Sequence, residues 1–126
     1  MIKTKKLKLY LEDMEQFKKK IKEELRAIGK GKAKTLREDS ISFQSLDQLR
    51  KFLTPKRLEL LRAIRHKKPQ SIYELAKLVE RTPENVNTDI KFLEQLGFIE
   101  VIKVKDIREK SVPEVSYDKM TLEIPI

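Results

Sequence analysis

The side chains best suited to chemistry lie together in residues 82–96, a segment that the sequence predicts to be a helix. Val86, Ile90 and Leu93 recur at spacings of four and three and define its inner face. The outward-facing polar side chains towards the start of the helix are Thr82, Glu84, Asn85, Asn87, Thr88 and Lys91. Asparagine offers a donor and an acceptor together, which matches the N6/N7 edge of adenine, whereas threonine and lysine suit bases or phosphates. This chemistry is recognition of a nucleic acid.

A plainer interpretation of the same positions stays open. Thr82 is also explained as a helix N-cap, and Asn85 and Asn87 as ordinary exposed polar residues. The helix is acidic, because Glu84, Asp89 and Glu94 outnumber Lys91. Affinity for phosphate must therefore come from flanking cations. The candidates are Arg81 in the turn before the helix and, after it, Lys103, Lys105, Arg108 and Lys110.

The formal charge of the chain is +9, from 29 Lys and Arg against 20 Asp and Glu. A basic balance suits a polyanionic partner. However, residues 1–37 hold 13 basic and 5 acidic groups, so that most of the excess lies outside the polar helix. Lysines 18, 19, 20 and 22 form a basic face of an N-terminal helix; they could contact phosphate in a dimer, but the favoured interpretation is a solvated face. Net charge alone is thus weak evidence for nucleic-acid binding.

The sequence offers no catalytic, metal-binding or cofactor-binding candidate. His66 is the only histidine, it stands beside Arg65, Lys67 and Lys68, and cysteine is absent. Neither a zinc-ligand spacing nor a glycine-rich phosphate loop occurs. We therefore expect a protein that is not an enzyme and uses no cofactor. Neither a signal peptide nor an apolar run of membrane-spanning length is present, which favours a cytoplasmic protein with no membrane partner.

Helix-start signals place the polar helix in a larger motif. Ser71 and Glu74 form a capping box that opens a short helix, and Thr82-Pro83 starts the next helix after a very tight turn. Gly97 stands where a left-handed residue ends that helix. Two helices joined so tightly must cross steeply, which is the helix-turn-helix arrangement.

The flanking segments complete this prediction. Ser45 and Thr54-Pro55 start two earlier helices. Residues 98–104 are predicted to be a strand, residues 106–114 a turn interrupted by Pro113, and Val115 the start of a returning strand that completes a hairpin, or wing. Residues 120–126 alternate as one more strand, for which the N-terminal strand is one candidate partner.

The N-terminal region is predicted to be a strand followed by an amphipathic helix. Leu7, Leu9 and Leu11 alternate with polar residues, and the helix spans about Glu12 to Ile28. Its apolar stripe, which either folds onto the rest of the chain or forms a dimer seam, consists of Met14, Phe17, Ile21, Leu25 and Ile28. The glycine-punctuated stretch 29–34 predicts a boundary, with an extension at 1–35 and a domain at 36–126.

Residues 41–126 resemble small prokaryotic winged-helix regulators of the MarR/ArsR-like class, and within it a group of predicted transcriptional regulators or antitoxin components. The segments that carry the likeness are residues 41–46 (ISFQSL), 53–61 (LTPKRLELL), 71–76 (SIYELA), 85–86 (NV), 89–91 (DIK), 93–99 (LEQLGFI), 117–118 (YD) and 124–126 (IPI). The resemblance implies that the helix from Thr82 to Leu96 reads DNA. It also implies a partner toxin for the antitoxin group.

These observations predict a mainly α protein with a small β content (α+β), a winged helix-turn-helix with an N-terminal strand-helix extension. We expect a homodimer that binds double-stranded DNA as a repressor. Two alternatives remain open. The same fold can dock or neutralise a partner protein, such as a toxin, to which an acidic helix would be suited. The lysine-rich N-terminal region can also bind RNA.

Overall fold

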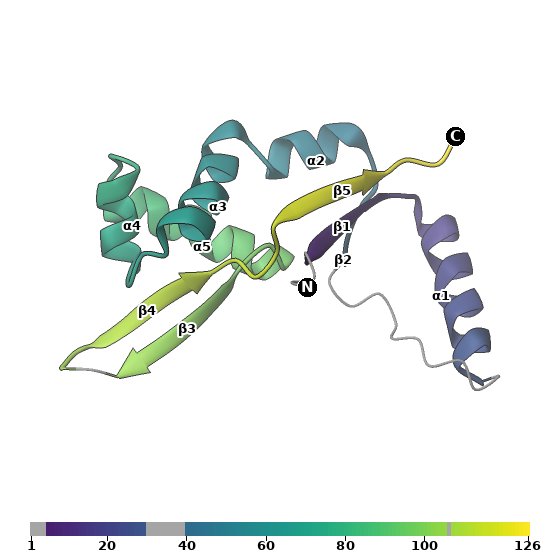
Figure 1. The fold of residues 1–126 in the computed structure, drawn as a ribbon. Helices are drawn as coiled ribbons and strands as arrows, with labels where there is room; N and C mark the ends of the chain where they lie inside the picture. Colours follow the sequence, from purple (N-terminus) through teal and green to yellow (C-terminus); the bar gives the residue numbers. More distant parts are fainter. Residues whose placement is uncertain (1–4, 30–39, 106) are drawn as a thin grey trace. The chain divides into compact units, whose positions relative to one another are not determined.

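The computed structural model describes residues 5–29, 40–105 and 107–126 (Figure 1). It is an α+β protein that divides into two compact units. One, here called the helical unit, contains Leu53–Asp118 together with Lys5. The other, the sheet unit, contains Lys6–Phe52 and Lys119–Ile126. The glycine-punctuated stretch, apart from Gly29, lies outside the described residues.

The sheet unit is built on a three-stranded parallel sheet. Its strands are β1 (Lys6–Leu11), β2 (Ser40–Phe43) and β5 (Lys119–Glu123), in the order β2-β1-β5. The C-terminal strand therefore does pair with the N-terminal one, with Leu9 opposite Leu122. Leu7 and Leu9 are buried, as their alternation predicts. Helix α2 (Leu46–Phe52) follows β2, and the Phe52 ring lies 6.0 Å from the Phe43 ring.

Helix α1 (Met14–Gly29) begins two residues later than predicted. Asp13 caps it through a hydrogen bond of 2.8 Å from the Gln16 backbone N–H. Glu12 is thus not part of the first turn. Its side chain is instead buried, with only 4% of the residue exposed. Its Oε1 accepts a hydrogen bond from the Ser42 hydroxyl, and the Lys20 Nζ lies 3.5 Å from its Oε2. The prediction that Lys20 belongs to a purely solvated face is wrong, because Lys20 also contacts Glu123 and the Tyr10 ring. A buried carboxylate needs such a cation.

The helical unit contains α3 (Pro55–Lys67), α4 (Ile72–Leu78) and α5 (Pro83–Leu96). The predicted caps are confirmed: Thr54, Ser71 and Thr82 each accept a hydrogen bond from the backbone N–H three residues later. Gly97 ends α5 in the left-handed conformation, with φ of 95°. The buried residues of the three helices are Leu60, Leu61, Ile64, Leu75, Ala76, Val86, Ile90 and Leu93. Helix α4 packs against α3, α5 and β4.

A hairpin of β3 (Glu100–Lys105) and β4 (Glu109–Glu114) follows α5. The prediction that residues 106–114 form a turn and that the strand returns at Val115 is wrong. The returning strand already begins at Glu109 and includes Pro113, which lies opposite Val101. Proline is tolerated here because each strand of a two-stranded hairpin has a free edge, where a missing N–H costs no hydrogen bond. Asp106 lies outside the described residues.

Candidate nucleic-acid interface

The outward side of α5 carries the polar residues that the sequence singles out. Asn85, Thr88 and Lys91 are exposed, and Asn87 is half-buried. The Thr88 hydroxyl donates to the Glu84 carbonyl at 3.0 Å, and the Thr82 hydroxyl caps the helix. Both hydroxyls therefore form hydrogen bonds with the backbone of the helix. Asn85, Asn87 and Lys91 lie on the same helix, whose inner face is fully buried.

Arg81 is engaged within the helical unit. Its Nη2 donates to Asp89 Oδ2 at 2.8 Å, while Arg57 Nε donates to Asp89 Oδ1 at 3.2 Å. The Arg57 guanidinium also lies 4.0 Å from the centre of the Phe92 ring. One carboxylate on α5 thereby joins α3 to the turn before α5. Two arginines also balance one of the three acidic charges on that helix, so the surface that α5 presents is less negative than its sequence indicates.

The basic residues of the hairpin are all exposed, but they do not share one face. Side chains alternate along a strand, so Lys103 and Lys105 lie on one face. The pairing of Lys110 with Val104 places Lys110 on the other. Arg108 lies in the turn between the strands. Lys103 is 3.7 Å from Glu109, in an ion pair so exposed that it leaves the lysine accessible.

A cleft of about 660 Å³ brings the hairpin and the two helix starts together. Asn87 and Glu84 of α5 line it with Arg108 and Lys110 of the hairpin. Ser71, Ile72 and Tyr73 from the start of α4 complete that wall. Tyr73 is an exposed aromatic residue near the start of α4 that was not predicted from the sequence as part of the site. The cleft holds two cations and two carboxylates, so it can offer donors and acceptors together.

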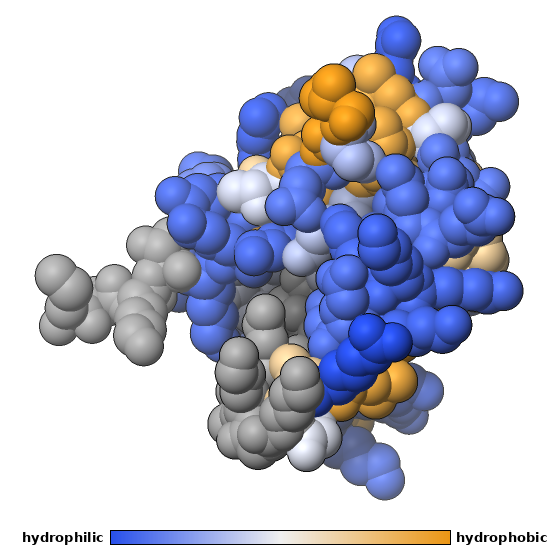
Figure 2. Space-filling view, turned by 90° about the vertical axis from the view of Figure 1, so that its right-hand side faces the viewer, coloured by the Kyte–Doolittle hydropathy of each residue, from blue (hydrophilic) through white to orange (hydrophobic). Residues whose placement is uncertain are grey.

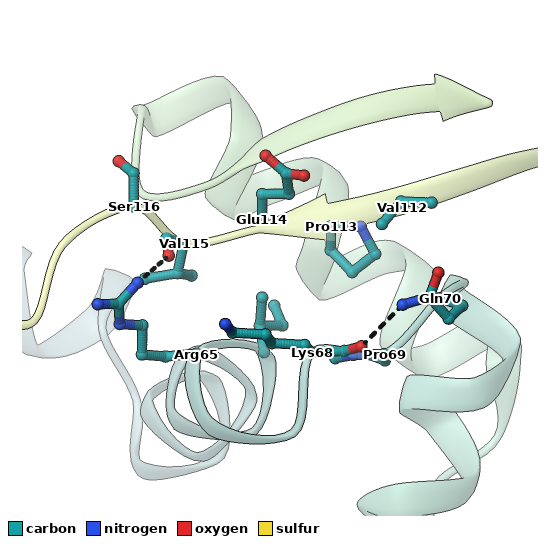
Figure 3. Close-up of a pocket in the computed structure, with 10 residues that line it drawn as sticks. Arg65, Lys68, Pro69, Gln70, Val112, Pro113, Glu114, Val115 and Ser116 are labelled. Atoms are coloured by element: carbon teal, nitrogen blue, oxygen red, sulfur yellow. Dashed lines mark hydrogen bonds between the residues drawn. The ribbon is translucent and has the colours of Figure 1, made fainter.

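The base of the hairpin is fixed to the helices (Figure 3). Arg65 of α3 donates to the Val115 carbonyl at 3.3 Å and forms an ion pair with Asp118. The Tyr117 hydroxyl donates to the Phe98 carbonyl at 2.7 Å, and burial raises the pKa of this phenol above its usual value. These contacts hold the segment after β4 against the end of α5. A second hollow, of about 480 Å³, lies between the end of α3 and β4 beside them.

The predicted dimer stripe on α1 is only partly covered within its unit. Met14 is 56% exposed and Leu25 50% exposed, while Phe17 and Ile21 are half-buried. The side chain of Ile28 lies outside the described residues. Figure 2 views the molecule from the side on which Figure 1 draws α1, and it shows a mainly hydrophilic surface interrupted by hydrophobic groups.

Among the described residues, no group of acidic or histidine side chains could hold a metal ion, and no helix has the length and apolar character needed to cross a membrane.

Capped helices followed by a hairpin define the helical unit as a small α+β structure. The chain belongs to the HVO_A0114 family, whose model matches residues 52–122, more than half of its length. No curated protein and no solved structure matches it.

Proposed function

We propose that this protein is a winged-helix regulator of the MarR/ArsR-like class that binds double-stranded DNA, with α5 in the major groove and the β3–β4 hairpin as the wing. The observation that carries the proposal is the cleft in which Asn87 of α5 meets Arg108 and Lys110 of the hairpin. In helix-turn-helix proteins the second helix reads base edges through its N-terminal residues. Asn85 and Asn87 occupy such positions, and Glu84 suits the N4 amino group of cytosine.

The wing supplies the contacts to phosphate in this proposal. Lys103, Lys105, Arg108 and Lys110 are exposed and accessible to a polyanion. Because Arg81 is engaged with Asp89, it acts on DNA indirectly, by holding the start of α5. Repression of the operon that encodes the protein is part of this proposal, whereas neutralisation of a partner toxin belongs to the alternative function, docking of a partner protein, which can coexist with DNA binding.

Binding to the DNA upstream of its own gene should weaken about tenfold when the salt concentration is doubled from 100 to 200 mM, if about four phosphates are neutralised. Fluorescence anisotropy with a labelled duplex measures this dependence. A single-stranded RNA of equal length serves as the comparison and should bind more weakly. Affinity that does not change with salt, or no binding at low salt, would contradict the proposal and leave protein docking as the function.

We further propose that α1 forms the seam of a homodimer. Its exposed Met14 and Leu25 lie on one stripe with Phe17 and Ile21. In a dimer with two-fold symmetry the same stripe of a second copy would cover these side chains. A dimer presents two recognition helices to half-sites about one helical turn apart.

Placing aspartates at two positions of the stripe, with Met14→Asp and Leu25→Asp, should weaken self-association by at least about tenfold, because burial of a charge in the seam is costly. Light scattering after size exclusion measures the mass. Lys19→Ser with Arg26→Ser changes the net charge equally on exposed positions on the other side of the same helix and should leave the dimer intact. A dimer that survives the aspartates would contradict the seam. Point variants are preferable to deletion, because β1 is the central strand of its sheet.

A further inference from the structure

The turn of the β3–β4 hairpin carries an isoleucine where turns usually carry small or polar residues. Ile107 is 97% exposed and lies between the strands, at the end of the hairpin that projects from the helices in Figure 1. Its neighbour Arg108 is basic and also exposed. Such a side chain contributes nothing to the core of its own unit. An apolar group held at the tip of a hairpin is suited to contact with a partner.

The cations around this tip show which partner fits. Lys103 and Lys105 project from one face of the ribbon and Lys110 from the other, and Arg108 stands beside the tip. A flat anionic surface would favour cations on one face only. Positive charge on both faces, with an apolar point between them, instead matches a groove bounded by two rows of phosphates. The minor groove of DNA has this form, and minor-groove proteins insert isoleucine and similar side chains between base steps.

We propose that Ile107 enters the minor groove beside the site of α5 and acts as a wedge that partly unstacks one base step and bends the duplex. This inference rests on the proposed DNA-binding function and names a second contact within it. The lysines on the two faces of the hairpin meet the two phosphate rows and hold the tip in place. Because pyrimidine–purine steps unstack most readily, the wedge makes the protein favour a TA or CA/TG step at that position, without any hydrogen bond to a base.

The test compares the full-length protein with the Ile107→Ala variant on a duplex from its own upstream DNA, labelled at both ends for energy transfer. A second duplex carries 2-aminopurine at the flanking step, where its fluorescence rises on unstacking. Wild type should bend the first duplex and brighten the second. Ile107→Ala should bind about 5- to 10-fold more weakly, with little bending and no brightening, because the variant loses the apolar contact with the base step and the contacts that the bend allows. Its dependence on salt should stay the same, since no phosphate contact is removed.

Val104→Ala is the matched control, because Val104 is an exposed apolar residue that lies in strand β3 and not in the turn. It should bind and bend like wild type. If Ile107→Ala also binds, bends and brightens like wild type, the wedge is overturned while DNA binding stands. If Val104→Ala loses affinity and bending equally, the tip has no special role and the proposal again fails. If wild type itself binds no duplex, the proposed function fails first, and that result is distinct from both others.

Discussion

Reversing two charges at the hairpin tip, with Lys105→Glu and Arg108→Glu in one chain, should lower the affinity for duplex DNA by at least about 100-fold near 100 mM salt. Each phosphate that a cation neutralises releases condensed counterions, and that release is the source of affinity that does not depend on sequence. In a dimer the two changes remove four cations and place four carboxylates against phosphates. The loss should be the same for the upstream DNA and for an unrelated duplex, because in the proposed complex these residues contact phosphates and not bases.

The fold should tolerate this change. Both side chains are exposed, and neither forms an ion pair within the described part of the chain. Lys105 lies opposite Glu109, so two like charges would face each other across the hairpin at a cost of up to about 1 kcal/mol. Thermal unfolding measures that cost separately from binding. Lys56→Glu with Arg62→Glu makes the same change in net charge on exposed positions of α3 and should reduce affinity far less. Equal affinity for wild type and the hairpin variant would show that the wing does not contact phosphate.

Local chemistry explains why much of the helical unit could be predicted from the sequence. A cap depends on a side chain and a backbone N–H three residues apart, so Ser71 and Thr82 predict where their helices begin without information from the rest of the chain. Gly97 likewise ends α5 because it adopts a left-handed conformation at little cost. The burial of Val86, Ile90 and Leu93 follows from helical periodicity alone.

Features that depend on distant partners could not be predicted in this way. The alternation in β1 indicates a strand, but it does not reveal that β2 and β5 both run parallel to it. Glu80 takes a left-handed conformation, with φ of 56°, at the end of α4, and a glutamate gives no signal of that role. In the candidate site, the exposed positions of α5 were predictable. The pairing of Arg81 with Asp89 was not, because charges in sequence do not show whether they face solvent or each other.

Removing the carboxylate that joins α3, the turn and α5, with Asp89→Ala, should lower the free energy of unfolding by about 2–3 kcal/mol. Asp89 accepts from both Arg57 and Arg81, and the three side chains are only 14%, 20% and 19% exposed. Without it two guanidinium groups stand close together, mostly out of water, with no anion between them. The repulsion between the two guanidinium groups destabilises the folded state. The cost of keeping these charges largely out of water destabilises it further, because no carboxylate offsets that cost. Urea unfolding followed by circular dichroism measures the difference.

The comparison that isolates this effect is Glu94→Ala, which removes one negative charge from an exposed position of the same helix. It should change the stability by no more than about 0.5 kcal/mol. Both variants raise the net charge equally, so any gain in DNA affinity from charge alone must appear in both. Asp89→Ala should gain less than Glu94→Ala, since it also releases the start of α5 from Arg81 and loosens the helix that is proposed to enter the major groove. Similar stability in the two variants would mean that Asp89 does not hold α5 in position, and that Arg81 is free to contact phosphate directly.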